Sequence, residues 1–501
     1  MPVTDEIAAV AAADPRRPAL TLALAVGATG FDYGTLIARA SRMARGLPGR
    51  SGIGGHDGEP ARIALLTRDN APFVPAFLAI LTAGAIAVIL DPKWSAAERQ
   101  RALAAVRPDL LLTDLPFGDP GLPTCTPADL AHAPPLAATL PVIDDEAPFL
   151  ITFTAGTTAA PKPIIRSHRS WLASLAVARD AFPIAAGEAV LVPGSLAHSL
   201  SLFALVEALS AGAHVHLLPR FDATAALDAI ARHAIRRLTA APTMYAALVA
   251  RAQTGGEAGA RFPGVATLVS AGAKLEPALR QDLAQVFPRA RIVEYYGASE
   301  LSFVAAGAAD DGCPADAVGR PLPGVQVSIR DETGREAAAG ATGRLWVRSP
   351  MLATAYLDGS PLTNGDGWAT VGDHARLDTD GWLYLAGRDH GMLVTGGLNV
   401  YPAEVETVLR AAEAVAEAAV FGLPDAWWGD GMVAVVALRN GRRPTKAELL
   451  AHCRDRLAVY KCPKRIFLMD ALPLRPSGKV AREELCRRLL AKPDSLVELA
   501  E

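Results

Sequence analysis

The feature that most constrains the fold of this chain is a regular alternation of short apolar runs with longer helix-like stretches, which continues to about residue 380. The helix-like stretches include 95–106 and 223–233. The apolar runs lie at 63–66, 85–90, 110–112, 189–192, 215–218 and 267–269. This rhythm predicts parallel β-sheets whose faces are covered by helices.

The pattern changes twice further along the chain. From Gly324 onward, short strands of alternating polarity with a Glu-Thr-Gly turn between them indicate an antiparallel barrel or meander. A second change lies near 387–391 and is followed by a compact α+β pattern. We therefore expect a large N-terminal domain, residues 1–388, and a small C-terminal domain, residues 389–501.

Composition and charge exclude several classes of protein. A formal net charge of −3 over 501 residues gives no basic field for nucleic acid. Five dispersed cysteines without a CxxC pair favour reduced thiols in a cytoplasmic protein over disulfides or a zinc site. His214 and His216 alternate on one strand face without an HExxH sequence or a carboxylate cluster, so we interpret them as strand residues and not as metal ligands.

One stretch, residues 71–90, is uncharged over about the length that spans a bilayer. It contains Pro72, Pro75 and Gly84, and its second half is rich in Ile and Val. A helix followed by a buried strand, with Gly84 between them, is therefore the better interpretation, and we expect no membrane span. The N-terminus lacks the basic start of a secretory signal.

The segment 152–162, Thr-Phe-Thr-Ala-Gly-Thr-Thr-Ala-Ala-Pro-Lys, follows an apolar strand pattern and places glycine between hydroxyl residues. A phosphate-binding loop needs inward-facing backbone N–H groups, small residues for close approach and hydroxyl donors. The chain contains no GxxxxGK[ST] sequence, so this segment is not a Walker A loop. The chain contains no GxSxG sequence either, which argues against a serine hydrolase.

Further segments follow this loop in a fixed order: 270–275, 294–300 (Glu-Tyr-Tyr-Gly-Ala-Ser-Glu), 366–373, 387–406 and 472–482. With the loop, they resemble the motifs of the adenylate-forming superfamily, which holds acyl-CoA synthetases, adenylation domains and luciferases. The resemblance runs from about Phe31 to Leu490 and is nearest to the aryl-acid-activating branch. It implies an α/β N-terminal domain of two helix-covered sheets and a small β-barrel, followed by a mobile α+β C-terminal domain.

The resemblance also implies the reaction, an ATP-dependent activation of a small-molecule carboxylic acid to an acyl-adenylate. Negative charge develops on the α-phosphate as pyrophosphate leaves, so the site must stabilise charge there. Ser299 would bond the α-phosphate, and Glu300, with Thr157, would hold Mg²⁺, a hard cation that prefers oxygen ligands. The remaining implied nucleotide contacts are Thr154, Gly156, Thr157, Thr158 and Lys162 for the triphosphate; Gly272, Ala273 and Tyr296 for adenine; Asp373 for ribose, with Arg388 nearby; and Tyr295 and Gly297 elsewhere in the nucleotide site.

In this family the C-terminal domain rotates between two half-reactions. The resemblance makes Lys479 the catalytic residue that bridges carboxylate and phosphate, and places Gly397 in the tunnel for the thiol that accepts the acyl group. That thiol belongs to CoA or to the phosphopantetheine arm of a carrier protein. The alternatives are therefore an acyl- or aryl-CoA ligase, a stand-alone adenylation enzyme that loads a carrier, and a nucleotide-binding relative without turnover.

The chain departs from the family pattern at several positions. Ala155 and Ala159 stand where Ser and Gly are usual, which removes one hydroxyl donor and predicts weaker ATP binding. His390 stands at the hinge where Asp or Lys is usual, Val371 replaces Thr, and Lys274 stands where Pro is common. The acyl site should include His198, Ser199, Ala271 and Gly297.

The residue at position 199 limits the acid. Amino-acid-activating relatives carry Asp and 2-hydroxybenzoate activators carry Asn where Ser199 falls. A free α-amino acid is therefore disfavoured, because the carboxylate that would pair with its amino group is missing. We expect an aryl or small-to-medium acyl carboxylate.

Overall fold

A computed structural model of the chain describes residues 2–23, 28–47, 60–117, 120–132, 141–154, 162–254, 260–388, 393–396, 398–425, 429–439, 441–473, 480, 482–492 and 495–500. Two compact units are distinguished by their internal contacts. The first comprises Met1–Pro92, Val106–Phe153 and Pro163–Ala386, and the second comprises Lys93–Ala105, Thr154–Lys162 and Gly387–Glu501. The domain boundary expected at residue 388 stays a prediction.

The larger sheet of the first unit has the strand order β15-β14-β13-β12-β11-β9-β10-β1-β2. The strands from β13 to β1 run parallel, while the pairs at the two edges are antiparallel. The strands are β1 (Pro18–Ala23), β2 (Ala28–Asp32), β9 (Ala189–Val192), β10 (His214–Leu217), β11 (Arg237–Ala240), β12 (Thr267–Ser270), β13 (Arg291–Ala298), β14 (Ser302–Ala308) and β15 (Arg320–Pro321).

The second sheet has the order β18-β8-β7-β4-β3-β5-β6. Its strands are β3 (Arg62–Leu66), β4 (Ile86–Ile89), β5 (Leu110–Thr113), β6 (Thr124–Cys125), β7 (Pro148–Thr154), β8 (Lys162–Ser167) and β18 (Ala355–Tyr356). The uncharged stretch 71–90 forms helix α3 (Asn70–Thr82) and strand β4, and Gly84 between them has φ +73°. The predicted helix and buried strand are confirmed. Among the helices that the structure describes, none combines the length and apolar character needed to cross a membrane.

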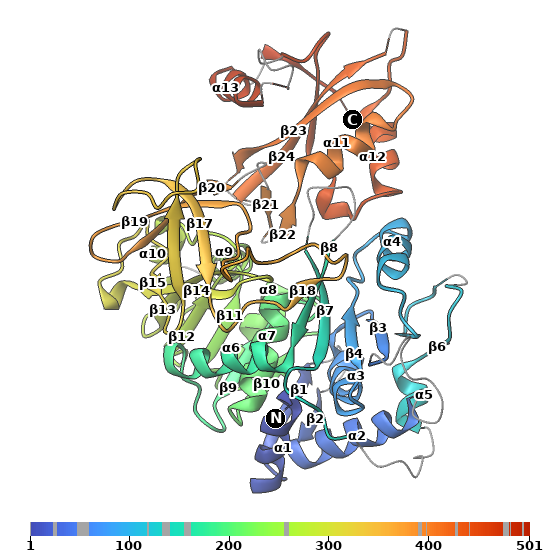
Figure 1. Ribbon diagram of the computed structural model, residues 1–501, viewed down its shortest axis with the longest axis vertical. Helices are drawn as coiled ribbons and strands as arrows, with labels where there is room; N and C mark the ends of the chain where they lie inside the picture. The colour runs from blue at the N-terminus through green and yellow to red at the C-terminus, as the bar shows by residue number, and fades with distance from the viewer. Residues whose placement is uncertain are drawn as a thin grey trace. The chain divides into compact units, whose positions relative to one another are not determined.

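Helices cover the two sheets, as the alternating pattern predicts (Figure 1). In the first unit they are α1 (Val3–Ala13), α2 (Tyr33–Gly46), α3, α5 (Pro127–His132), α6 (His168–Ala181), α7 (Ser199–Ser210), α8 (Ala223–Arg232), α9 (Pro242–Gln253), α10 (Pro277–Val286) and the 3-10 turn η2 (Ala309–Asp311). Side-chain caps begin several of them; Asp222 Oδ1, for example, accepts a hydrogen bond from Ala225 N at 2.8 Å.

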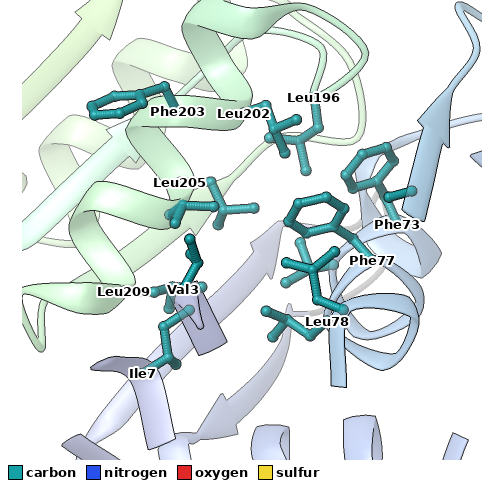
Figure 2. Packing of buried hydrophobic residues seen from close by; sticks show 14 of the residues in the cluster. Val3, Ile7, Phe73, Phe77, Leu78, Leu196, Leu202, Phe203, Leu205 and Leu209 are labelled. Atoms are coloured by element: carbon teal, nitrogen blue, oxygen red, sulfur yellow. The ribbon is translucent and has the colours of Figure 1, made fainter. Parts of the chain in front are cut away.

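The main apolar core of the first unit joins helices α1, α3 and α7. Val3 and Ile7 from α1 lie near Phe77 and Leu78 from α3 and Leu205 and Leu209 from α7 (Figure 2). Helices α3 and α7 are apolar on nearly all sides, which fits their burial between layers. This core packs against α7, whose first residue, Ser199, belongs to the expected acyl site.

The antiparallel pattern expected after Gly324 is confirmed by a sheet of order β16-β17-β19-β20. Its strands are β16 (Gln326–Arg330), β17 (Gly343–Arg348), β19 (Asp373–Leu377) and β20 (Leu383–Arg388), and β17 pairs antiparallel with both β16 and β19. Asp373, an expected ribose ligand, is the first residue of β19.

The second unit contains a sheet of order β22-β21-β24-β25-β26, with β23 paired to β24. Its elements are α4 (Ala96–Val106), β21 (Leu393–Thr395), β22 (Leu398–Val400), α11 (Pro402–Arg410), β23 (Val415–Asp425), β24 (Gly429–Leu438), α12 (Lys446–Arg454), η4 (Val459–Lys461), β25 (Arg465–Leu468), α13 (Arg482–Ala491) and β26 (Val497–Glu498). The expected α+β pattern is confirmed.

A buried lysine ties three segments of this unit together. Lys461 Nζ donates to Glu98 Oε1 of α4 at 2.8 Å and to Glu404 Oε1 of α11 at 2.9 Å. All three side chains are at most 3% exposed. Burial lowers the pKa of Lys461, but the carboxylates of Glu404 and Glu98 outweigh that effect and raise it, so the lysine stays charged.

Candidate active site

The turn from β13 to β14 carries the two residues expected to act on the α-phosphate, Ser299 and Glu300. Gly297 makes this turn possible, because a Cβ there would collide with the carbonyl of Ser302. Glu300 is 8% exposed, so its carboxylate is largely withdrawn from water. The turn therefore presents a hydroxyl and a shielded carboxylate side by side.

Arg166 of β8 supports this turn, and it is not among the residues expected from the sequence. Its Nη1 donates to Ser299 O at 3.2 Å, and its Nη2 donates to Ser170 O at 3.3 Å. Burial lowers the pKa of Arg166 to about 10, while the Glu300 carboxylate opposes that shift. No motif along the chain indicates this role, because it depends on the meeting of β8 with a turn 133 residues further along.

The expected acyl-site residues His198 and Ser199 lie beside this turn. Ser199 Oγ and Ser299 Oγ are 3.0 Å apart, and either can donate to the other. His198 Nε2 lies 3.6 Å from Asp91 Oδ2, which is 4% exposed. The first turn of α7 therefore joins the candidate acyl site to the candidate phosphate site.

Two residues expected to bind adenosine also lie together. Tyr296 donates a short hydrogen bond through its hydroxyl to Asp373 Oδ2. Asp373 is 8% exposed, and Tyr296 is partly buried. Its neighbour Tyr295 faces the other side of the strand, where its ring packs 4.8 Å from that of Phe303. The role of Tyr295 in nucleotide binding stays a prediction.

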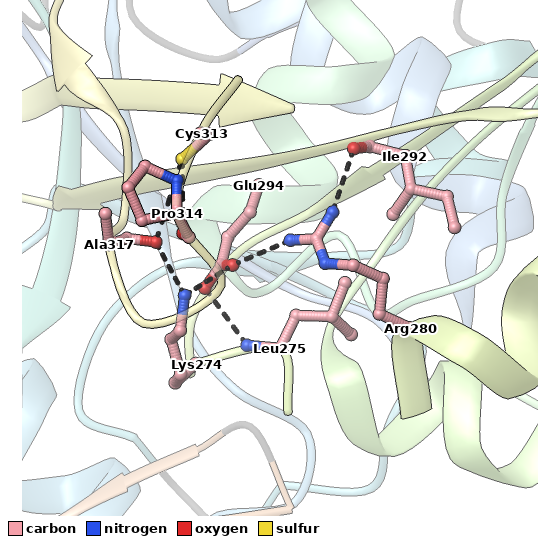
Figure 3. Close-up of polar contacts among 8 residues, drawn as sticks. All are labelled: Lys274, Leu275, Arg280, Ile292, Glu294, Cys313, Pro314 and Ala317. Carbon is pink, nitrogen blue, oxygen red and sulfur yellow. Dashed lines mark hydrogen bonds and ion pairs between the residues drawn. The ribbon is translucent and has the colours of Figure 1, made fainter. Parts of the chain in front are cut away.

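The loop after β12 holds the expected residues Ala271, Gly272 and Ala273, and Gly272 adopts φ +89°. Glu294 fixes this loop (Figure 3): its carboxylate accepts hydrogen bonds from Leu275 N at 3.0 Å, Lys274 Nζ at 2.9 Å and Arg280 Nη2 at 3.1 Å. The unusual Lys274 thus serves as an ion-pair partner in place of the common proline.

The phosphate loop is described only at its ends. Thr154 ends β7 and Lys162 begins β8, with Thr154 Oγ1 donating to Lys162 O at 3.4 Å. Outside the described residues or side chains lie the other expected contacts and departures: Ala155, Gly156, Thr157, Thr158, Ala159, Arg388, His390, Gly397 and Lys479. Their roles stay predictions.

No group of three His, Cys, Asp or Glu residues that could hold a metal ion occurs in the described part of the chain. Mg²⁺ in proteins keeps several waters and takes one or two protein carboxylates plus substrate phosphates. The shielded Glu300 carboxylate is the expected Mg²⁺ ligand, and that role stays a prediction. His216 lies on β10, where its ring packs 4.2 Å from His214 and 4.8 Å from His233.

Comparisons with known proteins assign the family. The model of the AMP-binding enzyme matches residues 7–357, and that of the AMP-binding enzyme C-terminal domain matches residues 404–479. The chain belongs to the AMP-binding enzyme family. The predicted family is confirmed, and so is the predicted enzyme class, an AMP-forming acid–thiol ligase.

Similar proteins include an uncharacterized acyl–CoA ligase, YhfT, of Bacillus subtilis, 35% identical over 91% of this chain and 92% of the relative. Indoleacetate–CoA ligase of Aromatoleum aromaticum is 33% identical over 70% of this chain and 69% of its own length. Among solved structures, o-succinylbenzoate CoA synthetase of Bacillus subtilis, bound with a product analogue, has a TM-score of 0.86 at 26% identity and 100% coverage of both chains. Amide bond synthetase McbA of Marinactinospora thermotolerans also has a TM-score of 0.86 at 26% identity, covering 97% and 99%.

Proposed function

We propose that this chain is an ATP-dependent acid–CoA ligase that acts on an aryl or arylalkanoic acid. In the first half-reaction a carboxylate oxygen attacks the α-phosphorus of ATP, which releases pyrophosphate and forms an acyl-adenylate. In the second, the thiol of CoA attacks the acyl carbon, AMP leaves and the thiol proton passes to solvent. The contact of Ser199 with Ser299 carries this proposal, because it puts the acyl side and the phosphate side within one hydrogen bond.

Each described residue has a chemical task in this scheme. Ser299 donates to the α-phosphate oxygen as its charge grows, and Glu300 holds Mg²⁺, which neutralises the phosphates when bound. Arg166 keeps Ser299 and Glu300 in place through the carbonyl of Ser299. Asp373 accepts from the ribose hydroxyls in exchange for the Tyr296 hydroxyl, whose release leaves the ring free to stack on adenine.

Several observations support this choice of acid and acceptor. Similar proteins include a feruloyl-CoA synthase of Amycolatopsis, 30% identical over 92% of this chain, and the indoleacetate–CoA ligase, both of which are named for aromatic acids and CoA. Ser199 removes the carboxylate that would pair with an α-amino group. A carrier protein as acceptor is the less favoured candidate; one similar protein, 30% identical over 68% of this chain, is named a fatty acid–acyl-carrier-protein ligase.

Pyrophosphate release with Mg-ATP across aryl, fatty and amino acids, with and without CoA, tests the proposal. We expect release with aryl acids and a CoA thioester detected by mass spectrometry. Adenylate that accumulates and never yields a CoA thioester would contradict CoA as the acceptor. Nucleotide binding without release from any acid would contradict the proposed activity.

A further inference from the structure

One face of helix α7 runs from the candidate reaction centre into the protein. Ser199, Phe203 and Glu207 follow one another at four-residue intervals, so they lie on the same side of the helix. Ser199 Oγ lies 3.0 Å from Ser299 Oγ, and the ring of Phe203 lies 4.9 Å from that of Phe303. Eight residues of helix place Glu207 about 12 Å along the axis from Ser199.

Aromatic rings line this direction. Phe182 and Tyr295 both pack on Phe303, at 5.6 Å and 4.8 Å between ring centroids, and Phe303 packs on Phe203. Burial raises the pKa of Tyr295, and the negative charge of Glu207 raises it further. Glu207 therefore lies within electrostatic reach of the Tyr295 side chain. The end of the aromatic cluster therefore carries a carboxylate.

Glu207 is one of several enclosed side chains, Arg237 among them, with a polar atom that makes no hydrogen bond to any described residue. Its Oε1 atom is enclosed and accepts no hydrogen bond from any described residue. Burial raises the pKa of Glu207 to about 7, although the positive charge of Arg237 opposes the shift. An enclosed acceptor without a donor costs about 1–3 kcal/mol, so a fold retains one where a ligand or water supplies the donor.

Arg237 does not satisfy this carboxylate by a direct bond. It is 1% exposed, and its Nη2 donates to Phe182 O at 2.8 Å and to Pro183 O at 2.7 Å. Its Nε lies 3.8 Å from Glu188 Oε1, on a different carboxylate. Arg237 therefore offsets the charge of Glu207 at longer range and leaves Oε1 available to accept a hydrogen bond.

We propose that Glu207 recognises a hydrogen-bond donor at the far end of the acid substrate. The acid has an aromatic body that packs along Phe203, Tyr295 and Phe303, and it ends in a hydroxyl or amino group about 12 Å from Ser199. This inference rests on the proposed function and specifies its substrate class. Glu207 determines specificity and takes no part in the chemical step.

Matched acids test the inference. The rate constant kcat/KM for CoA-thioester formation is measured with cinnamate, 4-hydroxycinnamate and 4-aminocinnamate. In wild-type protein, kcat/KM for 4-hydroxycinnamate or for 4-aminocinnamate should exceed that for cinnamate by about 10- to 100-fold. Whichever of the two acids is preferred identifies the donor group that Glu207 accepts. Glu207→Leu should bring that ratio close to one, and Glu207→Gln, which keeps an acceptor oxygen, should retain part of a hydroxyl preference. Glu413→Leu, at a carboxylate that is 79% exposed, is the matched control and should keep the wild-type ratio.

Equal rates for all three acids in wild-type protein, or an unchanged ratio in Glu207→Leu, would overturn the inference. Calorimetric binding of the same acids separates this outcome from failure of the proposed function. If donor-bearing acids bind more tightly in a Glu207-dependent way but no thioester forms, the inference stands and the proposed activity falls. If a thioester forms without donor preference, the activity stands and the inference falls.

Discussion

At the scale of single residues, His168 shows how burial makes one side chain sensitive to pH. Its Nδ1 accepts a hydrogen bond from Val3 N at 3.1 Å, and its ring stacks on Phe149 at 4.6 Å. Burial lowers the pKa of His168 to about 4, and His168 is 1% exposed. The neutral imidazole is thus part of the packing of α1.

Acid should therefore destabilise the first unit through His168. The unfolded chain takes up the proton below about pH 6.5, while the folded chain resists until about pH 4, so stability is present above the unfolded pKa and is lost as pH falls. We expect a loss of about 3 kcal/mol between pH 7 and pH 4 from this group. Denaturant unfolding across that range should show a smaller loss in His168→Gln. Parallel pH profiles for the two proteins would contradict this account.

Glu294 is the second residue whose removal has a defined consequence. Glu294→Ala leaves Lys274 and Arg280 without their shared carboxylate and frees the loop that carries Gly272. Because these cations are 28% and 20% exposed, we expect a moderate loss of stability, about 1–3 kcal/mol, with a raised KM for ATP. Glu276→Ala, at an exposed carboxylate next to the same loop, is the control. An unchanged KM for ATP in Glu294→Ala would show that the loop keeps its form without the clamp.

At the scale of elements, the sequence pattern predicted where strands and helices lie along the chain better than it predicted which strands pair with each other. The runs at 63–66 and 110–112 became β3 and β5, and 223–233 became α8, because local hydrophobic periodicity determines these elements. The pattern did not divide the strands between two sheets, since pairing depends on tertiary contacts. The role of Arg166 was missed for the same reason, because it depends on the meeting of β8 with a turn more than 130 residues away.

The buried Lys461 makes a prediction for helix α4. Lys461→Met would leave Glu98 and Glu404 buried without the ammonium group that they share, and burial already raises the pKa of Glu404. We expect a loss of about 3–5 kcal/mol in unfolding free energy, with α4 losing its attachment to α11. Hydrogen exchange of α4 amides reports that attachment directly. Lys492→Met, at an exposed lysine after α13, is the control, and equal protection of α4 in both variants would contradict the prediction.

At the scale of the whole molecule, the motif order along the chain predicted the family and the enzyme class, and both are confirmed. The described residues bring Ser199, Ser299 and Glu300 together, and they bring Tyr296 to Asp373. Glu207 could not be found from motifs, because its significance lies in an enclosed oxygen at the end of an aromatic cluster. Sequence periodicity alone makes it one more residue of an apolar helix.

Lys479 gives the whole-molecule prediction for two half-reactions that share one site. Lys479→Ala should slow acyl-adenylate formation by orders of magnitude, because it removes the cation that we propose bridges carboxylate and phosphate. Thioester formation from supplied acyl-adenylate and CoA should remain close to wild type. Lys492→Ala, at an exposed lysine, is the control for both assays. An equal loss in the two half-reactions would contradict the role given to Lys479.

The central claim is that an acyl-adenylate lies on the path to the thioester. The most direct measurement supplies an acid labelled with ¹⁸O in both carboxylate oxygens, with Mg-ATP and CoA, and follows the label by mass spectrometry. The account predicts one ¹⁸O in each AMP released and none in pyrophosphate, because the attacking carboxylate oxygen stays on the α-phosphorus when the thiol displaces AMP. Label in inorganic phosphate or pyrophosphate, or AMP without label, would contradict it.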